Sequence, residues 1–147
     1  MWWVNRIMML GVLVLLSHSD IRTHKISTTV LAAGGAVSVW NFSCQLYARE
    51  VDVWVVAAGI AVGSVFLLVS RVTEQGMGYG DSITILILGA FLGLWQLLEV
   101  LCVSFLAVGI CSVVLLSVKR MSRKCTIPFL PFLTGGYMVV VIGGAGV

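Results

Sequence analysis

The sequence predicts an all-α membrane protein of about six transmembrane helices, and three observations support this fold class. Of its 147 residues, 60% are hydrophobic and only 10% are charged, whereas a soluble domain carries about 25% charged residues. The apolar residues form continuous runs, unlike the alternating pattern of an outer-membrane barrel. At ~20 residues per spanning helix, the chain has room for about six spans. We therefore predict a single transmembrane domain over residues 1–147.

The first three spans are separated by short polar segments. Apolar runs cover residues 2–17, 28–47 and 53–70, and the longest polar break between them is 17–27. A secretory signal peptide would also explain the first run. However, no small-residue A-x-A cleavage site precedes His18, and further spans follow. We therefore expect the first run to be a retained helix.

The second half of the chain contains one long apolar stretch and a final span. A polar loop at residues 71–81 precedes the stretch from Ser82 to Val118. Its length fits two spans, and we place the tight turn between them at residues 95–99, where polar side chains interrupt the run. The last span is expected at residues 126–147.

Two glycine pairs of the GxxxG type lie in the third and fourth spans, Gly59 with Gly63 and Gly89 with Gly93. Small residues at this spacing allow two helix backbones to approach closely within a membrane. We interpret both pairs as helix-packing contacts and not as part of a chemical site.

The basic residues predict the orientation in the membrane. With six spans, seven of the nine fall on one side and two on the other. The seven are Arg22, Lys25, Arg71, Lys119, Arg120, Arg123 and Lys124. The positive-inside rule makes their side cytoplasmic. We therefore expect a multi-pass protein of the cytoplasmic (inner) membrane with both termini outside.

Two aspartates are expected at this cytoplasmic face, Asp20 at the end of the first span and Asp81 at the start of the fourth. Carboxylates at the edge of membrane helices are costly enough to suggest function. If the two meet, they share one proton, because they cannot both ionise cheaply. The ionised partner can then deprotonate a water while the protonated partner donates to a carbonyl, as in aspartic proteases. The pair is our candidate catalytic site.

Three glycines precede the second aspartate, at Gly76, Gly78 and Gly80. Alternating glycines do not favour a helix. We expect them to form a loop that supports the site by letting a substrate backbone come close. The simpler interpretation of the glycines is a flexible turn.

Each aspartate also has a purely structural interpretation. Asp81, followed by Ser82, would suit a helix N-cap, and Asp20 would suit an interfacial charge at a helix end. A small transporter could instead use the two as a proton relay. That alternative has weak support, because both carboxylates are expected at one face and none near the bilayer midplane.

Neither a metal, a cofactor nor a nucleic acid is expected as a partner. The four cysteines, at positions 44, 102, 111 and 125, form no CxxC pair, which argues against a metal site or a redox motif. The net charge of +3 is small, and we relate it to membrane topology.

Three motifs resemble those of the type IV prepilin peptidases, which are GxGD membrane aspartyl proteases. Residues 76–81, GMGYGD, resemble the GxGD motif itself. Residues 20–26, DIRTHKI, are similar to the first-aspartate segment D-x-R-x-x-x-I, and residues 127–132, IPFLPF, are similar to the I-P-F-x-P-F that opens the last helix. The order of the three motifs also matches, so the resemblance covers the whole chain.

The resemblance implies that Asp20 and Asp81 are the catalytic pair of an endopeptidase. It implies a prepilin or pilin-like substrate whose short basic leader is cut at the cytoplasmic face, in a type IV pilus or protein secretion system. The paired CxxC motifs of the family's N-methyltransferase domain are missing, so the chain resembles the short, peptidase-only members. The resemblance leaves open whether the protein works as a homo-oligomer.

The chain departs from the family pattern at Ile83, where the family usually has lysine two residues after the GxGD aspartate. Ser27 and Thr28 replace the common Pro-Asn, and Leu130 replaces a small residue. Both aspartates are retained. The alternative function is a non-enzymatic membrane subunit or an inactive relative in a pilus or secretion system.

Overall fold

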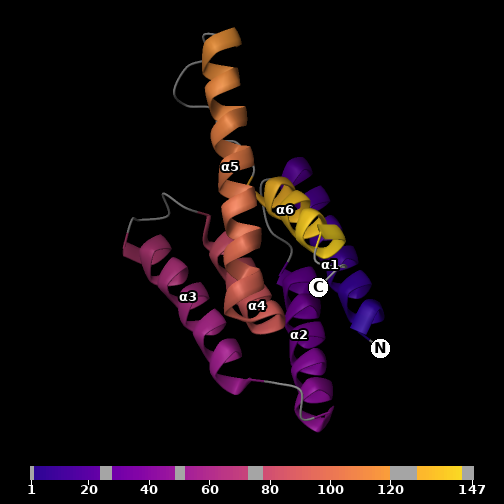
Figure 1. The fold of residues 1–147 in the computed structure, drawn as a ribbon. Coiled ribbons are helices and arrows are strands. Elements are labelled where there is room, and N and C mark those ends of the chain that lie inside the picture. The colour runs from indigo at the N-terminus through magenta and orange to yellow at the C-terminus, as the bar shows by residue number, and fades with distance from the viewer. Residues whose placement is uncertain (1, 24–27, 49–51, 73–77, 120–128, 144–147) are drawn as a thin grey trace.

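The computed structural model describes residues 2–23, 28–48, 52–72, 78–119 and 129–143, and within these ranges the chain is helical (Figure 1). The helices are α1 (Trp2–Thr23), α2 (Thr28–Ala48), α3 (Val53–Val72), α4 (Tyr79–Leu92), α5 (Leu94–Lys119) and α6 (Leu130–Gly143). The predicted all-α fold is confirmed.

Among the described residues, two helical segments are long and apolar enough to cross a membrane, Val53–Val72 and Leu94–Leu115. This supports a membrane protein. The helices α4 and α6 have 14 residues each, or about 21 Å of helix, which is shorter than a hydrocarbon core of ~30 Å. The number of spans and the location of the termini therefore stay predictions.

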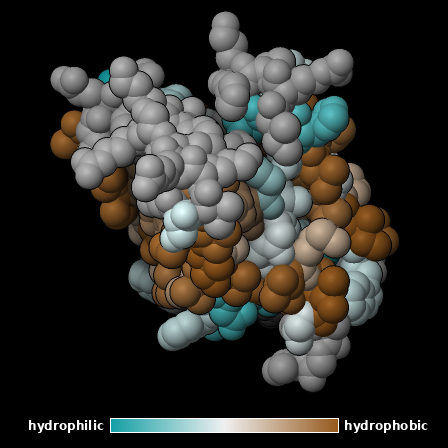
Figure 2. Space-filling model, turned by 90° about the horizontal axis from the view of Figure 1, so that it is seen from above, coloured by the Kyte–Doolittle hydropathy of each residue, from teal (hydrophilic) through white to brown (hydrophobic). Residues whose placement is uncertain are grey.

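The outer surface of the bundle is also suited to lipid. Figure 2, which looks down on the bundle, shows hydrophobic side chains on much of its periphery. Tyr47 at the end of α2 is 95% exposed, and Trp54 at the start of α3 is 86% exposed. Exposed aromatic residues near helix ends are typical of a membrane–water interface. These residues would suit an interface at the end of the bundle where α2 ends and α3 begins.

Several predicted boundaries were wrong. The first span was expected to end at Asp20, but the first helix continues to Thr23. The fourth helix begins at Tyr79, so Gly80 and Asp81 belong to a helix and not to the preceding loop. Glycine is unfavourable in a helix interior, but Gly80 lies in the first turn, where the carbonyl of Gly78 already accepts the amide protons of Asp81 and Ser82.

The turn between the fourth and fifth helices was also misplaced. We expected it at residues 95–99, but the break falls on Gly93, and α5 begins at Leu94. Gly93 has φ 75° and ψ −177°, a conformation that glycine adopts without a steric penalty. In Figure 1 the chain runs down α4 and returns up α5 after this residue.

The backbones of α3 and α4 touch through glycines. A Cβ atom added at Gly59 would lie 2.5 Å from the carbonyl oxygen of Gly89, and one added at Gly63 would collide with the Cα atom of Leu86. The predicted packing role of the first GxxxG pair is thus confirmed. In the second pair, Gly89 makes the contact while Gly93 forms the break. This contact fixes the position of α4, which carries Asp81.

The first helix is held by its neighbours α2 and α6, while α2 in turn packs on α4. The core contains Leu13 and Leu16 of α1, Leu88 of α4 and Tyr137 of α6, all at most 2% exposed. A polar bond supports it: the Tyr137 hydroxyl donates to the carbonyl of Arg6 at 3.1 Å. These contacts set the position of α1 along the bundle axis.

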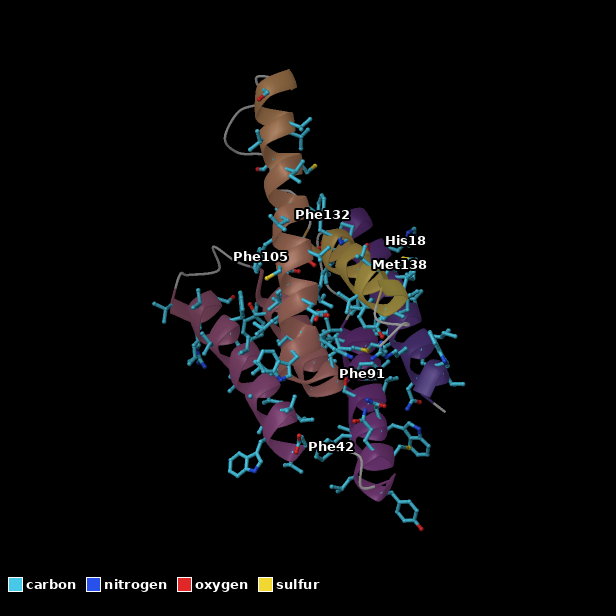
Figure 3. All side chains as sticks on the ribbon, viewed as in Figure 1. His18, Phe42, Phe91, Phe105, Phe132 and Met138 are labelled. Carbon is cyan, nitrogen blue, oxygen red and sulfur yellow. The ribbon has the colours of Figure 1, made fainter. Side chains whose placement is uncertain are left out.

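Aromatic rings join the other side of the bundle. Phe105 of α5, labelled in Figure 3, has its ring centroid 6.1 Å from that of Phe66 on α3 and 5.5 Å from that of Phe129, just before α6. Beyond Phe105, α5 projects above the other helices (Figure 1).

The glycine contact predicts a large difference between two alanine substitutions. Gly63→Ala should lower the free energy of unfolding by about 1–3 kcal/mol, because the new methyl group overpacks against the α4 backbone. Gly109→Ala is the matched control, since an added Cβ there meets no atom within 4 Å. Unfolding of the purified protein in detergent micelles measures both. Equal effects of the two substitutions would contradict the contact.

Candidate active site

The structure places the two candidate aspartates at the same end of the bundle. Asp20 lies in the last turn of α1, and Asp81 is the third residue of α4. Both side chains are half-buried, and the two carboxylates are close enough to interact electrostatically. Residues 61 positions apart in the sequence are therefore neighbours at one end of the bundle.

Asp81 is not a helix N-cap, so that alternative interpretation was wrong. The N-cap of α4 is Gly78, which has no side chain to offer. The backbone amides of Asp81 and Ser82 donate instead to the carbonyl of Gly78, at 3.0 and 3.2 Å. The position of Asp81 in the first turn thus does not depend on a capping bond from its own side chain.

The carboxylate of Asp81 lies against Gly78. A Cβ atom added at Gly78 would be 2.8 Å from Oδ2 of Asp81, which is closer than real Cβ atoms come to other groups. With φ −53° and ψ 123°, Gly78 has a backbone conformation open to any residue. The preference for glycine at this position is therefore steric. The group next to Gly78 is the carboxylate of Asp81. From the sequence we had expected a substrate backbone to lie close to the glycines.

Two hydroxyl groups that the sequence analysis did not single out brace this turn. The Thr84 hydroxyl donates to the carbonyl of Gly80 at 2.8 Å, and the Ser82 hydroxyl donates to that of Gly78 at 3.5 Å. Both residues are almost fully buried. Each hydroxyl residue follows a motif glycine by four residues in the sequence. This spacing could have indicated a hydrogen bond from the side chain to a carbonyl of the preceding helical turn.

Some motif residues cannot be placed. Gly76, His24 and the Ile127–Pro128 start of the third motif lie outside the described residues. Ile83 is half-buried in α4, and His18 is exposed. Within the described part of the chain, no three His, Cys, Asp or Glu side chains gather as a metal ion would require.

Comparison with known proteins identifies one family. A family model described as the type IV leader peptidase family matches residues 7–113, a range that contains Asp20 and Asp81. Neither a curated protein nor a solved structure matches the chain.

The proximity of the two aspartates predicts efficient cross-linking. In a background with all four cysteines changed to alanine, the Asp20→Cys and Asp81→Cys pair should react with a short bismaleimide reagent within one chain, seen as a mobility shift in gels. Asp52→Cys with Asp81→Cys is the control pair, because Asp52 precedes α3 at the other end of the bundle. Cross-linking of the control pair alone would contradict the arrangement.

Proposed function

Because this chain belongs to the type IV leader peptidase family, we propose that it is a membrane aspartyl endopeptidase with Asp20 and Asp81 as its catalytic pair. Family membership makes it a protease of the prepilin leader peptidase type. The observation that carries the finer proposal is the electrostatic interaction between the two carboxylates. The substrate is a prepilin-like protein, and the product is that protein without its short basic leader.

The pair works by sharing one proton. Two carboxylates that come within hydrogen-bonding reach titrate as a unit, with one ionised and one protonated near the middle of their pH range. The ionised carboxylate takes a proton from a water molecule, which attacks the scissile carbonyl carbon. The protonated carboxylate donates to the carbonyl oxygen. When the tetrahedral intermediate collapses, the C–N bond breaks and the leaving amine takes a proton from the pair.

The location of the pair suits a substrate with one basic and one hydrophobic segment. Asp20 and Asp81 lie at helix ends, beside the apolar residues that follow in α4. A scissile bond at this depth would leave the basic leader in the cytoplasm while the hydrophobic helix stays in the membrane. The excess of lysine and arginine on this side supports the cytoplasmic location.

A non-enzymatic member of a pilus or secretion system is the second candidate. Ile83 favours it, since this position usually carries lysine in the family, and the side chain here is apolar and half-buried. The two candidates differ in whether the phenotype depends on the aspartates.

Asp20→Asn and Asp81→Asn should each reduce leader cleavage by at least about 100-fold, because each removes one proton-transfer group. Co-expression with a candidate prepilin and a gel shift of the leaderless product measures cleavage, and an immunoblot of the membrane fraction measures accumulation of the protein. Asp52→Asn is the control, since Asp52 lies at the other end of the bundle. Cleavage that survives either Asp20→Asn or Asp81→Asn would contradict the aspartyl mechanism. A pilus phenotype that neither substitution changes would favour the non-enzymatic candidate.

Gly78→Ala should separate catalysis from stability. The nearest atom to the new methyl group is the end of the Asp81 side chain, which can rotate away at little cost in folding. The displaced carboxylate should nevertheless reduce cleavage about 10–100-fold, since a shift of ~1 Å has effects of this size. Gly135→Ala, at a site with no atom within 4 Å, should leave cleavage unchanged. If Gly78→Ala cleaves as fast as the unmodified protein, the steric role of this glycine is wrong.

A further inference from the structure

A polar cavity lies at the end of the bundle opposite the two aspartates. Its volume is about 330 Å³, and its walls include Arg6 near the start of α1, Gln45 near the end of α2 and Gly93 after α4. Asp81 and Gly93 are twelve residues apart, or about 18 Å along the helix. The cavity is therefore separate from the candidate active site.

The cavity is built around a buried arginine. Arg6 is only 6% exposed, and its Nη2 donates to Oε1 of Gln96 at 2.9 Å. Asn41, also in the wall, donates to the carbonyl of Phe91 at 3.2 Å and accepts from Asn5 at 2.9 Å. A charged residue in an apolar helix is costly, and it usually marks a functional site.

An apolar groove of about 340 Å³ adjoins this cavity. Val56 of α3 lines both, so the two spaces share a wall. The groove runs between α2 and α3, where Gly35 and Ala57 leave room, and α4 forms its floor with Ile87 and Ala90. Its lining is almost entirely apolar.

We propose that the cavity and groove together bind one phospholipid. The headgroup phosphate occupies the polar cavity, where Arg6 supplies the positive charge and amide side chains supply further donors. An acyl chain follows the groove between α2 and α3. Asp52 also lines the cavity, and it suits the ammonium of an ethanolamine headgroup.

The depth of the site supports a lipid. The exposed Tyr47 and Trp54 mark a membrane interface at this same end of the bundle, so the cavity lies at headgroup level and the groove extends into the hydrocarbon layer. The lining of the groove also suits an acyl chain, because it is apolar along the α2, α3 and α4 residues that form it.

The test is thermal unfolding of the purified protein in detergent micelles, followed by tryptophan fluorescence, with three probes. Dioleoyl phosphatidylethanolamine should raise the midpoint temperature in a saturable manner, because a ligand that binds only the folded state stabilises it. Dioleoylglycerol, which has the same chains but no phosphate, should not do so. Inorganic phosphate alone should also have no effect.

Matched substitutions test each half of the site. Arg6→Gln should raise the half-saturating lipid concentration about tenfold, the usual loss with one charge-assisted bond, whereas Arg71→Gln, at an exposed arginine, should not. Ala57→Leu fills the groove and should also abolish the saturable shift. Ala61→Leu, one turn further along α3 on an exposed position outside both linings, should retain it. The Ala57 and Ala61 pair keeps the test decisive if Arg6→Gln fails to fold.

Four results would overturn the proposal. An equal shift with dioleoylglycerol would mean that the headgroup is not recognised. An equal shift with phosphate alone would make the cavity a small-anion site. A saturable shift that survives Ala57→Leu, or that a hydrophobic prepilin helix peptide abolishes by competition, would assign the groove to something other than an acyl chain.

Discussion

The close contact between α3 and α4 is the constraint on which the rest of the structure depends. The backbone at Gly59 and Gly63 lies against the α4 backbone with no room for a side chain. In a membrane, van der Waals contact of this kind is a main source of helix association. The hydrophobic effect does not drive helices together there, because the lipid tails are as apolar as the side chains. Once the position of α4 in the bundle is fixed, its first turn determines where Asp81 lies, and its end determines where α5 begins.

The position of Asp20 depends on a different set of contacts. Asp20 is carried by α1, whose position depends on contacts with α2 and α6. Here the Tyr137 hydroxyl of α6 holds α1, because it donates to the backbone carbonyl of Arg6 at 3.1 Å. Since this bond is to the backbone, it resists sliding of α1 along its axis. The last helix can thus influence the aspartate pair without contributing a residue to it.

The two ends of the bundle have opposite chemistry. One end carries the paired carboxylates, and the other carries the buried Arg6 with its amide neighbours. The helix α4 connects the ends, with Asp81 in its first turn and the Arg6 cavity against its last.

The sequence by itself determined the helical class and the helices Thr28–Ala48 and Val53–Val72 to within two residues. It also singled out the two aspartates that lie at one end of the bundle. These follow from long apolar runs and from the order of three short motifs, which are local properties. Tertiary structure decided the rest. Gln96 looked like a turn residue because it is polar, but its amide accepts from Arg6, 90 positions earlier, and the break falls on Gly93. A side chain at Gly78 would crowd the Asp81 carboxylate. Neither could be foreseen, because a local pattern does not show which distant side chain will satisfy a buried polar group or occupy a given space.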